Sequence, residues 1–241
     1  MEQVCGRYVA STPTAVLADV FDVDETLIET DEPSFNVAPT DPVPAIAVNR
    51  AGRRTLGRMR WGLVPSWSSD TRGAARMINA RVETVLTARA FRAAFERRRC
   101  LVPADGFYEW LRRDTGGKPT KQAWYISNAD GSIMAMAGIW EVWRSHPDGE
   151  LLRTCAILTT TPDEVMRPIH DRMPVILPSD AWEDWLAKDT PPDVALAITT
   201  ATPRLTRHPV GPAVNSVKNN GPELIVPVPE EPEPPVALRL L

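Results

Sequence analysis

The stretch that decides the fold is Cys100-Leu101-Val102-Pro103-Ala104-Asp105-Gly106-Phe107-Tyr108-Glu109-Trp110. Its two apolar segments, Cys100–Val102 and Gly106–Trp110, are separated by a Pro, an Ala and an Asp. Apolar and aromatic runs punctuated by Pro, Asp and Gly are typical of short strands joined by a turn. We therefore predict two consecutive strands here, joined through residues 103–105.

Outward from this stretch the chain repeats the same pattern of strands and turns. Ala45–Asn49 and Thr55–Trp61 alternate about Arg50-Ala51-Gly52-Arg53, which predicts a hairpin. A turn is predicted at Asp114-Thr115-Gly116-Gly117. The other predicted strands are residues 5–9, Gln122–Ile126, Ile133–Trp140, Thr154–Thr160 and Ala195–Thr202.

Helical patterns are fewer than strand patterns. One helix is predicted over Ala88–Arg98, and Ser179 is predicted to cap a second helix that ends at Leu186. Phe35–Thr40 and Trp61–Trp67 are predicted as ordered loops. We therefore predict a single α+β domain over residues 5–226, with a curled, mostly antiparallel β core and flanking helices. The Pro- and Glu-rich segment 227–241 is predicted to be a disordered tail.

The bulk composition is that of an ordinary soluble globular protein of 241 residues, with 43% hydrophobic and 24% charged residues. No apolar run reaches the roughly 18 residues of a membrane span, and the N-terminus shows no signal-peptide pattern. Cys5, Cys100 and Cys155 are widely spaced and form no CxxC motif, so neither a disulfide scaffold nor a zinc site is expected. We expect a cytoplasmic monomer that needs no metal or cofactor.

The net charge is −4, but most of the chain outside two acidic stretches is basic. Eleven of the 31 acidic residues lie in two short stretches, 19–32 and 223–233. The rest of the chain carries 20 acidic residues against 27 basic ones, of which 23 are Arg. Arg suits phosphate recognition because its planar fork donates two hydrogen bonds at once. Nucleic acid is therefore a possible partner, although a GC-rich genome alone also produces an Arg-rich protein.

The first candidate for chemistry is Cys5, in Val4-Cys5-Gly6-Arg7-Tyr8. A cysteine that begins a chain carries a thiol beside a free α-amine, with ordinary pKa values of about 8.5 and 7.7–8.0. This pair can trap an aldehyde, because the amine forms a Schiff base and the thiol then closes a thiazolidine ring. As written, Cys5 follows Met1–Val4 and its nitrogen is an amide, so the alternative is a buried structural cysteine.

Further polar residues lie in apolar surroundings. Asn36 can bond a substrate oxygen or complete a turn. Glu109 lies in an aromatic run, where burial would raise its pKa and make it a usable acid or base, unless it faces outward from a half-exposed strand. His170 titrates naturally near neutrality and is followed by Asp171 and Arg172, although a lone His is more often structural.

A second set of residues could contact nucleic acid. Asn79, Arg81 and Glu83 alternate and could present polar side chains on one face of an extended segment. Trp61 and Trp67 are either core residues or platforms for unpaired bases.

The acidic stretch contains one competing motif. Asp22-Val23-Asp24-Glu25-Thr26 matches the DxDxT signature of haloacid dehalogenase-type phosphatases. That signature needs a buried strand before it, whereas Ala15–Ala18 is a poor strand. A solvated acidic helix or loop over 18–32 is the preferred interpretation.

Six segments occur in the order that is typical of the SOS response-associated peptidase family, and together they resemble it over residues 5 to about 226. They are Cys5–Tyr8, Asn36–Thr40, Trp61–Trp67, Asn79–Glu83, Pro103–Trp110 and Ile169–Pro174. The resemblance implies a single β-rich domain with a basic groove for single-stranded DNA. It also implies a role in DNA repair and the SOS response, in which the protein crosslinks to abasic sites.

The resemblance also implies roles for individual residues. Cys5 would link to the ring-opened abasic sugar, and Asn36 would position both. Glu109 would shuttle protons, and His170 would assist ring opening. Weak lyase and self-processing peptidase activities are implied as well. The implied DNA contacts are Arg7, Trp61, Trp67, Asn79, Arg81 and Arg172. The alternative from another class is a single-stranded DNA-binding protein that forms no covalent bond.

The N-terminus departs from the family pattern, in which the cysteine directly follows the initiator Met. Here Val4 stands at the position of that Met. We expect Cys5 to be the first residue of the mature protein. Translation would begin at a GTG codon at position 4, or residues 1–4 would be made and then removed.

Overall fold

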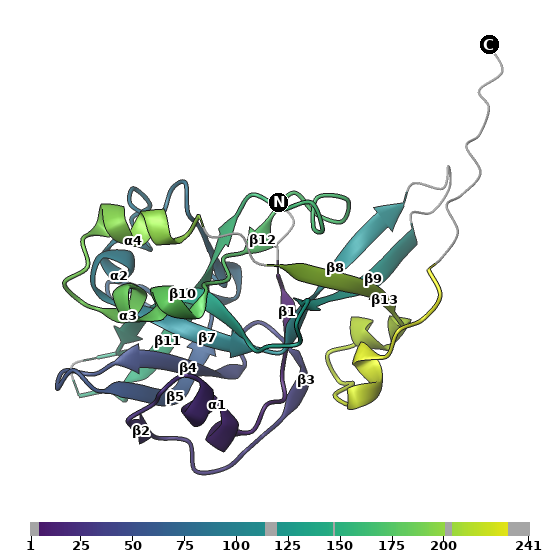
Figure 1. Ribbon diagram of the computed structural model, residues 1–241. Helices are drawn as coiled ribbons and strands as arrows, with labels where there is room; N and C mark the ends of the chain where they lie inside the picture. The colour runs from purple at the N-terminus through teal and green to yellow at the C-terminus, as the bar shows by residue number, and fades with distance from the viewer. Residues whose placement is uncertain (1–4, 114–119, 147, 201–203, 231–241) are drawn as a thin grey trace.

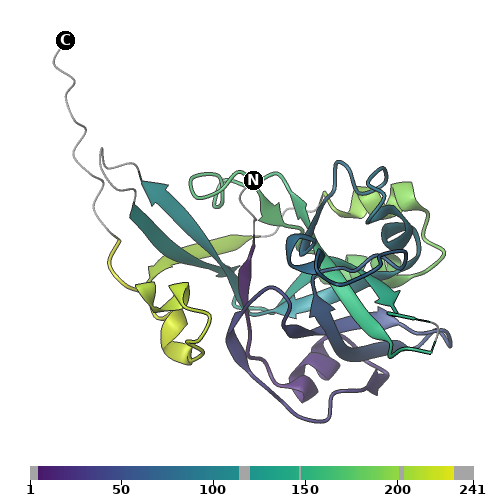
Figure 2. The same cartoon turned by 180° about the vertical axis from the view of Figure 1, so that it is seen from behind.

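The computed structural model describes residues 5–113, 120–146, 148–200 and 204–230. Within them the chain forms two sheets that meet at β1, as Figure 1 shows. The helices lie around the larger sheet, and Figure 2 shows the same arrangement from behind. The α+β class and the mostly antiparallel β core are therefore confirmed.

The larger, eight-stranded sheet curls into a barrel. Its order is β12-β11-β10-β7-β4-β5-β2, and β11 also pairs with β5, which closes the curl. A short strand, β6, adds to β11 in parallel. The strands are β2 (Glu25–Thr26), β4 (Pro42–Val48), β5 (Arg54–Trp61), β6 (Asn79–Arg81), β7 (Arg99–Ala104), β10 (Met134–Trp143), β11 (Leu152–Thr160) and β12 (Met173–Pro174). The predicted hairpin is β4–β5, with Gly52 at a φ of 81° in its turn.

The smaller, five-stranded sheet has the order β13-β9-β8-β1-β3. Its strands are β1 (Arg7–Ala10), β3 (Ser34–Val37), β8 (Gly106–Arg113), β9 (Thr120–Asn128) and β13 (Leu205–Val210). The chain passes from one sheet to the other at Asp105, between β7 and β8. The Asp105 carboxylate accepts hydrogen bonds from the main-chain N–H groups and hydroxyls of Ser11 and Thr12. Asp105 therefore ties the crossover to the end of β1 and sets how the sheets meet.

The helices are short and lie mostly over the barrel. They are α1 (Thr14–Val20), α2 (Arg92–Arg97), α3 (Trp182–Leu186) and α4 (Pro192–Ile198). The 3-10 turns are η1 (Ala74–Arg76), η2 (Ser179–Ala181), η3 (Pro212–Asn215) and η4 (Pro222–Ile225). No helix in the described ranges is long and apolar enough to cross a bilayer.

Three apolar clusters hold these layers together. One fills the space between the two sheets and includes Cys5, Tyr8 and Trp61. A second packs the barrel against the helices, and a third packs β8, β9 and β13 against the C-terminal turns. Burial of apolar surface of this kind contributes about 25 cal/mol per Å². The first cluster is the one that positions the candidate site.

Several predictions about local structure were wrong. Phe35–Thr40 is not all loop, because Ser34–Val37 pairs with β1 as strand β3. The first part of the predicted strand Ala195–Thr202 is instead the end of α4 (Pro192–Ile198), which begins with Pro192 in a favourable first-turn position; residues 201 and 202 lie outside the described ranges. Ser179 makes no side-chain cap bond, since it lies within η2.

The boundaries of other predicted elements differ from those in the structure. The helix predicted over Ala88–Arg98 is regular only over α2, because turns occupy residues 84–91. The turn predicted at 114–117 lies outside the described residues, as does the tail from 231 onward. Backbone pairing continues past 226, since Pro227 bridges to Val210 and the Val228 N–H donates to the Pro209 carbonyl.

Candidate active site

Cys5 lies two residues before the first residue of β1 at the junction of the two sheets, with its side chain fully buried. Its φ of 47° is in the left-handed region that L residues rarely adopt. Its main-chain nitrogen donates a hydrogen bond to Oε1 of Glu109. Burial, reinforced by the nearby Glu109, raises the pKa of the thiol well above its ordinary value, so the thiol is protonated at neutral pH.

Glu109 reaches Cys5 because β8 is the neighbour of β1, with Tyr108 opposite Arg7. Glu109 is only 3% exposed, so of the two alternatives that the sequence left open the structure has the buried one. Burial raises its pKa to about 7, against the opposing effect of N–H groups of Cys5 and Trp110; Asp171 raises it further. A carboxyl that is half ionised near neutrality can both accept and donate a proton.

His170 lies between β11 and β12, in the segment whose Ile169 and Met173 belong to the same apolar cluster as Cys5. Its side chain is 13% exposed, and its Nδ1 lies 2.9 Å from Oδ1 of Asp171. The main-chain N–H of Arg172 also points at Nδ1, at 3.1 Å. Burial lowers the pKa of His170, and Asp171 acts in the opposite direction.

Asn79, Arg81 and Glu83 lie beside the His170 segment across the end of β11. Arg81 pairs with Thr159, which pairs in turn with Pro174 on β12. The predicted extended segment is present for Asn79 and Arg81 in β6, where Arg81 is exposed, whereas Glu83 lies in the turn that follows.

Arg172 is placed differently from the prediction. Its guanidinium donates to both carboxylate oxygens of Glu83 and to the Thr159 carbonyl, and only 11% of its side chain is exposed. These bonds neutralise its charge. Arg172 therefore braces the His170 segment against β6 and β11, and a phosphate would have to compete with Glu83 for it.

Asn36 is buried and its amide is already occupied. Its Oδ1 accepts from Arg7 at 2.6 Å, while its Nδ2 donates to the carbonyls of Asn219 at 2.9 Å and Ser216 at 3.0 Å. The Arg7 guanidinium also donates to the Val214 carbonyl at 3.0 Å. Asn36 therefore holds Arg7 and the 214–219 segment together.

Comparison with known proteins gives a family. Residues 4–217 match the SOS response associated peptidase family. The chain belongs to this family. It is 40% identical to "Abasic site processing protein YoaM" of Bacillus subtilis over 92% of this chain and 97% of that one. It is 32% identical to "Abasic site processing protein YedK" of Escherichia coli, over 93% and 100% respectively.

Solved structures agree on the fold of this family member. A Bacteroides thetaiotaomicron protein matches with a TM-score of 0.81 and 23% identity, over 93% of this chain and all (100%) of that one. A Bordetella bronchiseptica protein matches with a TM-score of 0.71 and 25% identity, over 86% and 100%.

Trp61 and Trp67, both predicted to stack on DNA bases, differ in their exposure to solvent. Trp61 is fully buried, its indole N–H donates to the Ile78 carbonyl, and it packs edge-on against Tyr8. It belongs to the core and cannot stack on a base. Trp67 is 54% exposed, and the guanidinium of Arg89 lies 4.5 Å from its ring centroid.

Trp67 and Arg81 belong to separate parts of the surface. The loop that follows β5 bonds to Thr154 through the Val64 N–H, whereas Arg81 pairs with Thr159. Five residues of strand separate these positions on β11, or roughly 17 Å at 3.3–3.4 Å per residue. The pairing of Arg89 with Trp67 escaped sequence reasoning because only the fold brings these loops together.

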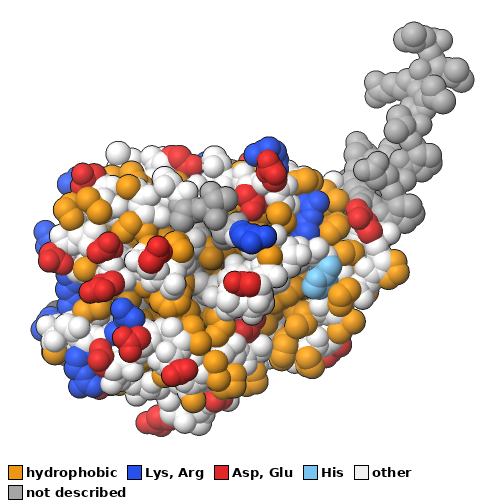
Figure 3. All heavy atoms as spheres, in the orientation of Figure 1, with side chains coloured by type: hydrophobic (Ala, Val, Ile, Leu, Met, Phe, Trp, Pro, Cys, Tyr) orange, Lys and Arg blue, Asp and Glu red, His pale blue; other side chains and the backbone are white. Residues whose placement is uncertain are grey.

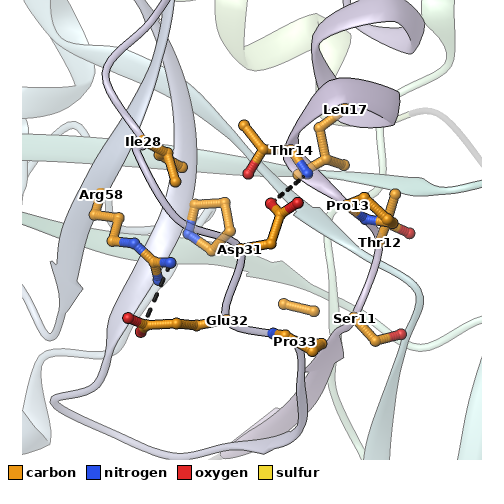
Figure 4. Close-up of a pocket in the computed structure, with 12 residues that line it drawn as sticks. Ser11, Thr12, Pro13, Thr14, Leu17, Ile28, Asp31, Glu32, Pro33 and Arg58 are labelled. Atoms are coloured by element: carbon orange, nitrogen blue, oxygen red, sulfur yellow. Dashed lines mark hydrogen bonds and ion pairs between the residues drawn. The ribbon is translucent and has the colours of Figure 1, made fainter.

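A separate hollow lies away from these residues. It encloses about 400 Å³, including its open mouth, between the start of α1 and the β4–β5 hairpin. Asp31 accepts from the Thr14 N–H there, and Arg58 lies 3.7 Å from Glu32 (Figure 4). None of its lining residues is a predicted site residue.

The phosphatase motif is not built as such an enzyme needs. Asp22 follows α1 in a turn, and the Asp24 carboxylate accepts the Arg54 N–H at the barrel edge.

Acidic side chains are spread over the surface around α1, α3 and α4 in Figure 3. This face does not provide the concentrated positive charge that a DNA backbone requires.

Proposed function

We propose that this chain processes abasic sites in single-stranded DNA by joining the ring-opened sugar to Cys5 through a thiazolidine ring. The observation that carries the proposal is the hydrogen bond from the Cys5 nitrogen to the buried carboxyl of Glu109. An amine that attacks an aldehyde must first lose a proton, and this arrangement holds a base at the nitrogen itself. The names of the relatives, abasic site processing proteins, support the same substrate.

The bond changes balance as a condensation. The α-amine of Cys5 adds to the aldehyde carbon, and the carbinolamine loses one water to give a Schiff base. The sulfur then adds to the same carbon while its proton passes to the imine nitrogen. The products are a five-membered ring and one water molecule.

Glu109 is matched to these proton transfers. Its pKa of about 7 lies within roughly one unit of the 7.7–8.0 of an α-amine, so proton exchange between the two groups is nearly balanced. Glu109 takes a proton from the ammonium group and returns it to the departing hydroxyl. His170 donates to the sugar oxygen as the ring opens.

The backbone at Cys5 supports the removal of residues 1–4. A left-handed conformation at a non-glycine residue costs on the order of 1–3 kcal/mol. The φ angle is defined by the preceding carbonyl, so the strain ends when Cys5 becomes the first residue. We propose that a start at position 4 or self-cleavage achieves this, the latter being the peptidase activity that the family description names.

DNA contacts come from two regions in this proposal. Arg81 and Arg7 hold phosphates near Cys5, and the exposed Trp67 with Arg89 stacks on a base farther along the strand. Weak lyase activity accompanies the Schiff base, because the imine acidifies the neighbouring carbon and permits elimination of the 3′ phosphate. The protein acts as a monomer.

The test compares two preparations, the full chain and a chain cut so that Cys5 is the first residue. Each is incubated with a single-stranded oligonucleotide that carries one abasic site. An intact oligonucleotide and one whose sugar aldehyde has been reduced are the controls. We expect a band that survives heat and detergent only with Cys5 first and the aldehyde present. A band seen only in native gels would indicate non-covalent binding and refute the crosslink.

A further inference from the structure

Two neighbouring groups contact Nδ1 of His170, and they require different protonation of this nitrogen. Nδ1 of His170 is approached by two groups, the Asp171 carboxylate at 2.9 Å and the Arg172 N–H at 3.1 Å. A ring nitrogen either carries a proton or presents a lone pair, so it cannot serve both at once. The Arg172 bond requires the lone pair, and the Asp171 bond requires the proton.

The two contacts therefore require different proton positions at Nδ1. When Nδ1 carries no proton, the ring is neutral, Nδ1 accepts from Arg172 and the proton is on Nε2. In the imidazolium, Nδ1–H donates to Asp171, whose side chain is 87% exposed and can stay ionised. Among the described residues, Nε2 of His170 has no hydrogen-bond partner in either state, so it is the nitrogen that can act on a substrate.

We propose that Asp171 is a positioning residue that receives Nδ1–H of protonated His170 and so makes this histidine a proton donor through Nε2. After Nε2 gives its proton to a sugar oxygen, the ring keeps Nδ1–H on Asp171 and becomes neutral. Without Asp171 the neutral imidazole ring is favoured, with Nδ1 accepting the hydrogen bond from the Arg172 N–H. Nε2–H can then donate a hydrogen bond but cannot transfer its proton. The catalytic part of this inference rests on the proposed function.

The surrounding charges make Asp171 the deciding group. Arg112 on β8 and Arg172 oppose protonation of His170, as does burial, and Asp171 alone among its charged neighbours favours it. Asp171 also lies close enough to Glu109 to favour the protonated form of that carboxyl. One exposed carboxylate thus acts on both groups that move protons at Cys5.

The test is Asp171→Asn, which keeps the shape of the side chain and removes its charge. Glu164→Gln is the matched control, since it removes an exposed charge from the same segment. The chain has three histidines, so NMR can follow the ring of His170 while His146 and His208 serve as internal references. We expect the His170 titration midpoint to fall in Asp171→Asn and to stay in place in Glu164→Gln. An unmoved midpoint, or an equal shift in both variants, overturns the inference.

A second measurement follows crosslinking against pH in the chain that begins at Cys5. We expect Asp171→Asn to lose about ten-fold in rate at pH 7, with the loss shrinking at lower pH where His170 is protonated without help. An unchanged pH profile beside a lowered midpoint would remove Asp171 from the reaction. If the unsubstituted protein forms no crosslink, the proposed function fails, while the NMR titration still decides the contact.

Discussion

Replacing Glu109 by Gln separates what this carboxyl does in the reaction from what it does to the fold. Burial raises its pKa from an ordinary 4.5 to about 7. Because each pKa unit corresponds to about 1.36 kcal/mol, the difference between the folded and unfolded states amounts to roughly 3 kcal/mol. The side chain is only 3% exposed, so solvent screens little of this effect.

The sign follows from proton linkage. Between pH 4.5 and 7 the folded protein holds a proton on Glu109 that the unfolded chain has released. Stability therefore falls as pH rises through this window, and the full loss is present above pH 7. Gln does not titrate, so the variant lacks this decline. Its buried amide costs a further 1–2 kcal/mol or so at every pH, which leaves the pH dependence as the diagnostic quantity.

Urea unfolding of the full chain at pH 5 and pH 8 measures the effect. We expect the stability difference between Glu109→Gln and the unsubstituted protein to move by about 2.5 kcal/mol in favour of the variant over this interval. The exposed Glu164→Gln substitution is the control and should show no such trend. In the chain that begins at Cys5, the same Glu109 variant should slow crosslinking by about 10²–10⁴. Parallel stability curves together with an unaltered rate would refute both the buried ionisation and the acid–base role.

Three further substitutions test other parts of the site. Cys5→Ala should abolish the heat-stable crosslink and leave salt-sensitive binding to single strands intact, as denaturing and native gels would show; a surviving thiazolidine band contradicts the assignment. Arg81→Ala should weaken binding to intact single strands and lower the slope of log affinity against log salt by roughly one, whereas Arg92→Ala, whose partner is Glu96, should not. Asn36→Ala should lower the free energy of unfolding by about 2–3 kcal/mol in urea titrations, because it strips partners from Arg7 and the 214–219 segment; a change below 0.5 kcal/mol or so would show that this network is not stabilising.

Local pattern was sufficient for much of the scaffold. The hairpin 45–61 and the consecutive strands around Asp105 follow from apolar runs and turn residues, whereas the pattern left Glu109 either buried or exposed. These are short-range properties, since alternation and turn chemistry act within a few residues. Ser34–Val37 was missed because Pro and Asn nearby favour a loop, and only pairing with β1 overrides them.

The site itself depends on long-range contacts. Cys5 and Glu109 are 104 positions apart, and they meet because β1 and β8 are neighbours. The same fold closes Glu83 over Arg172 and ties up the amide of Asn36, which changes the roles expected of both. Local sequence patterns do not predict such pairings, because the sequence around a charged residue does not show whether its partner will be a carboxylate or a phosphate.

The sequence alone thus determined the fold class, the motifs that resemble the family and the residue types able to trap an aldehyde. The tertiary structure decided which of them converge, that Trp61 belongs to the core while Trp67 is exposed, and which nitrogen of His170 is contacted by its neighbours. The physical reason is the distance along the chain over which each interaction acts. Propensity and pattern are set by neighbours in the chain, whereas desolvation and charge pairing are set by neighbours in space.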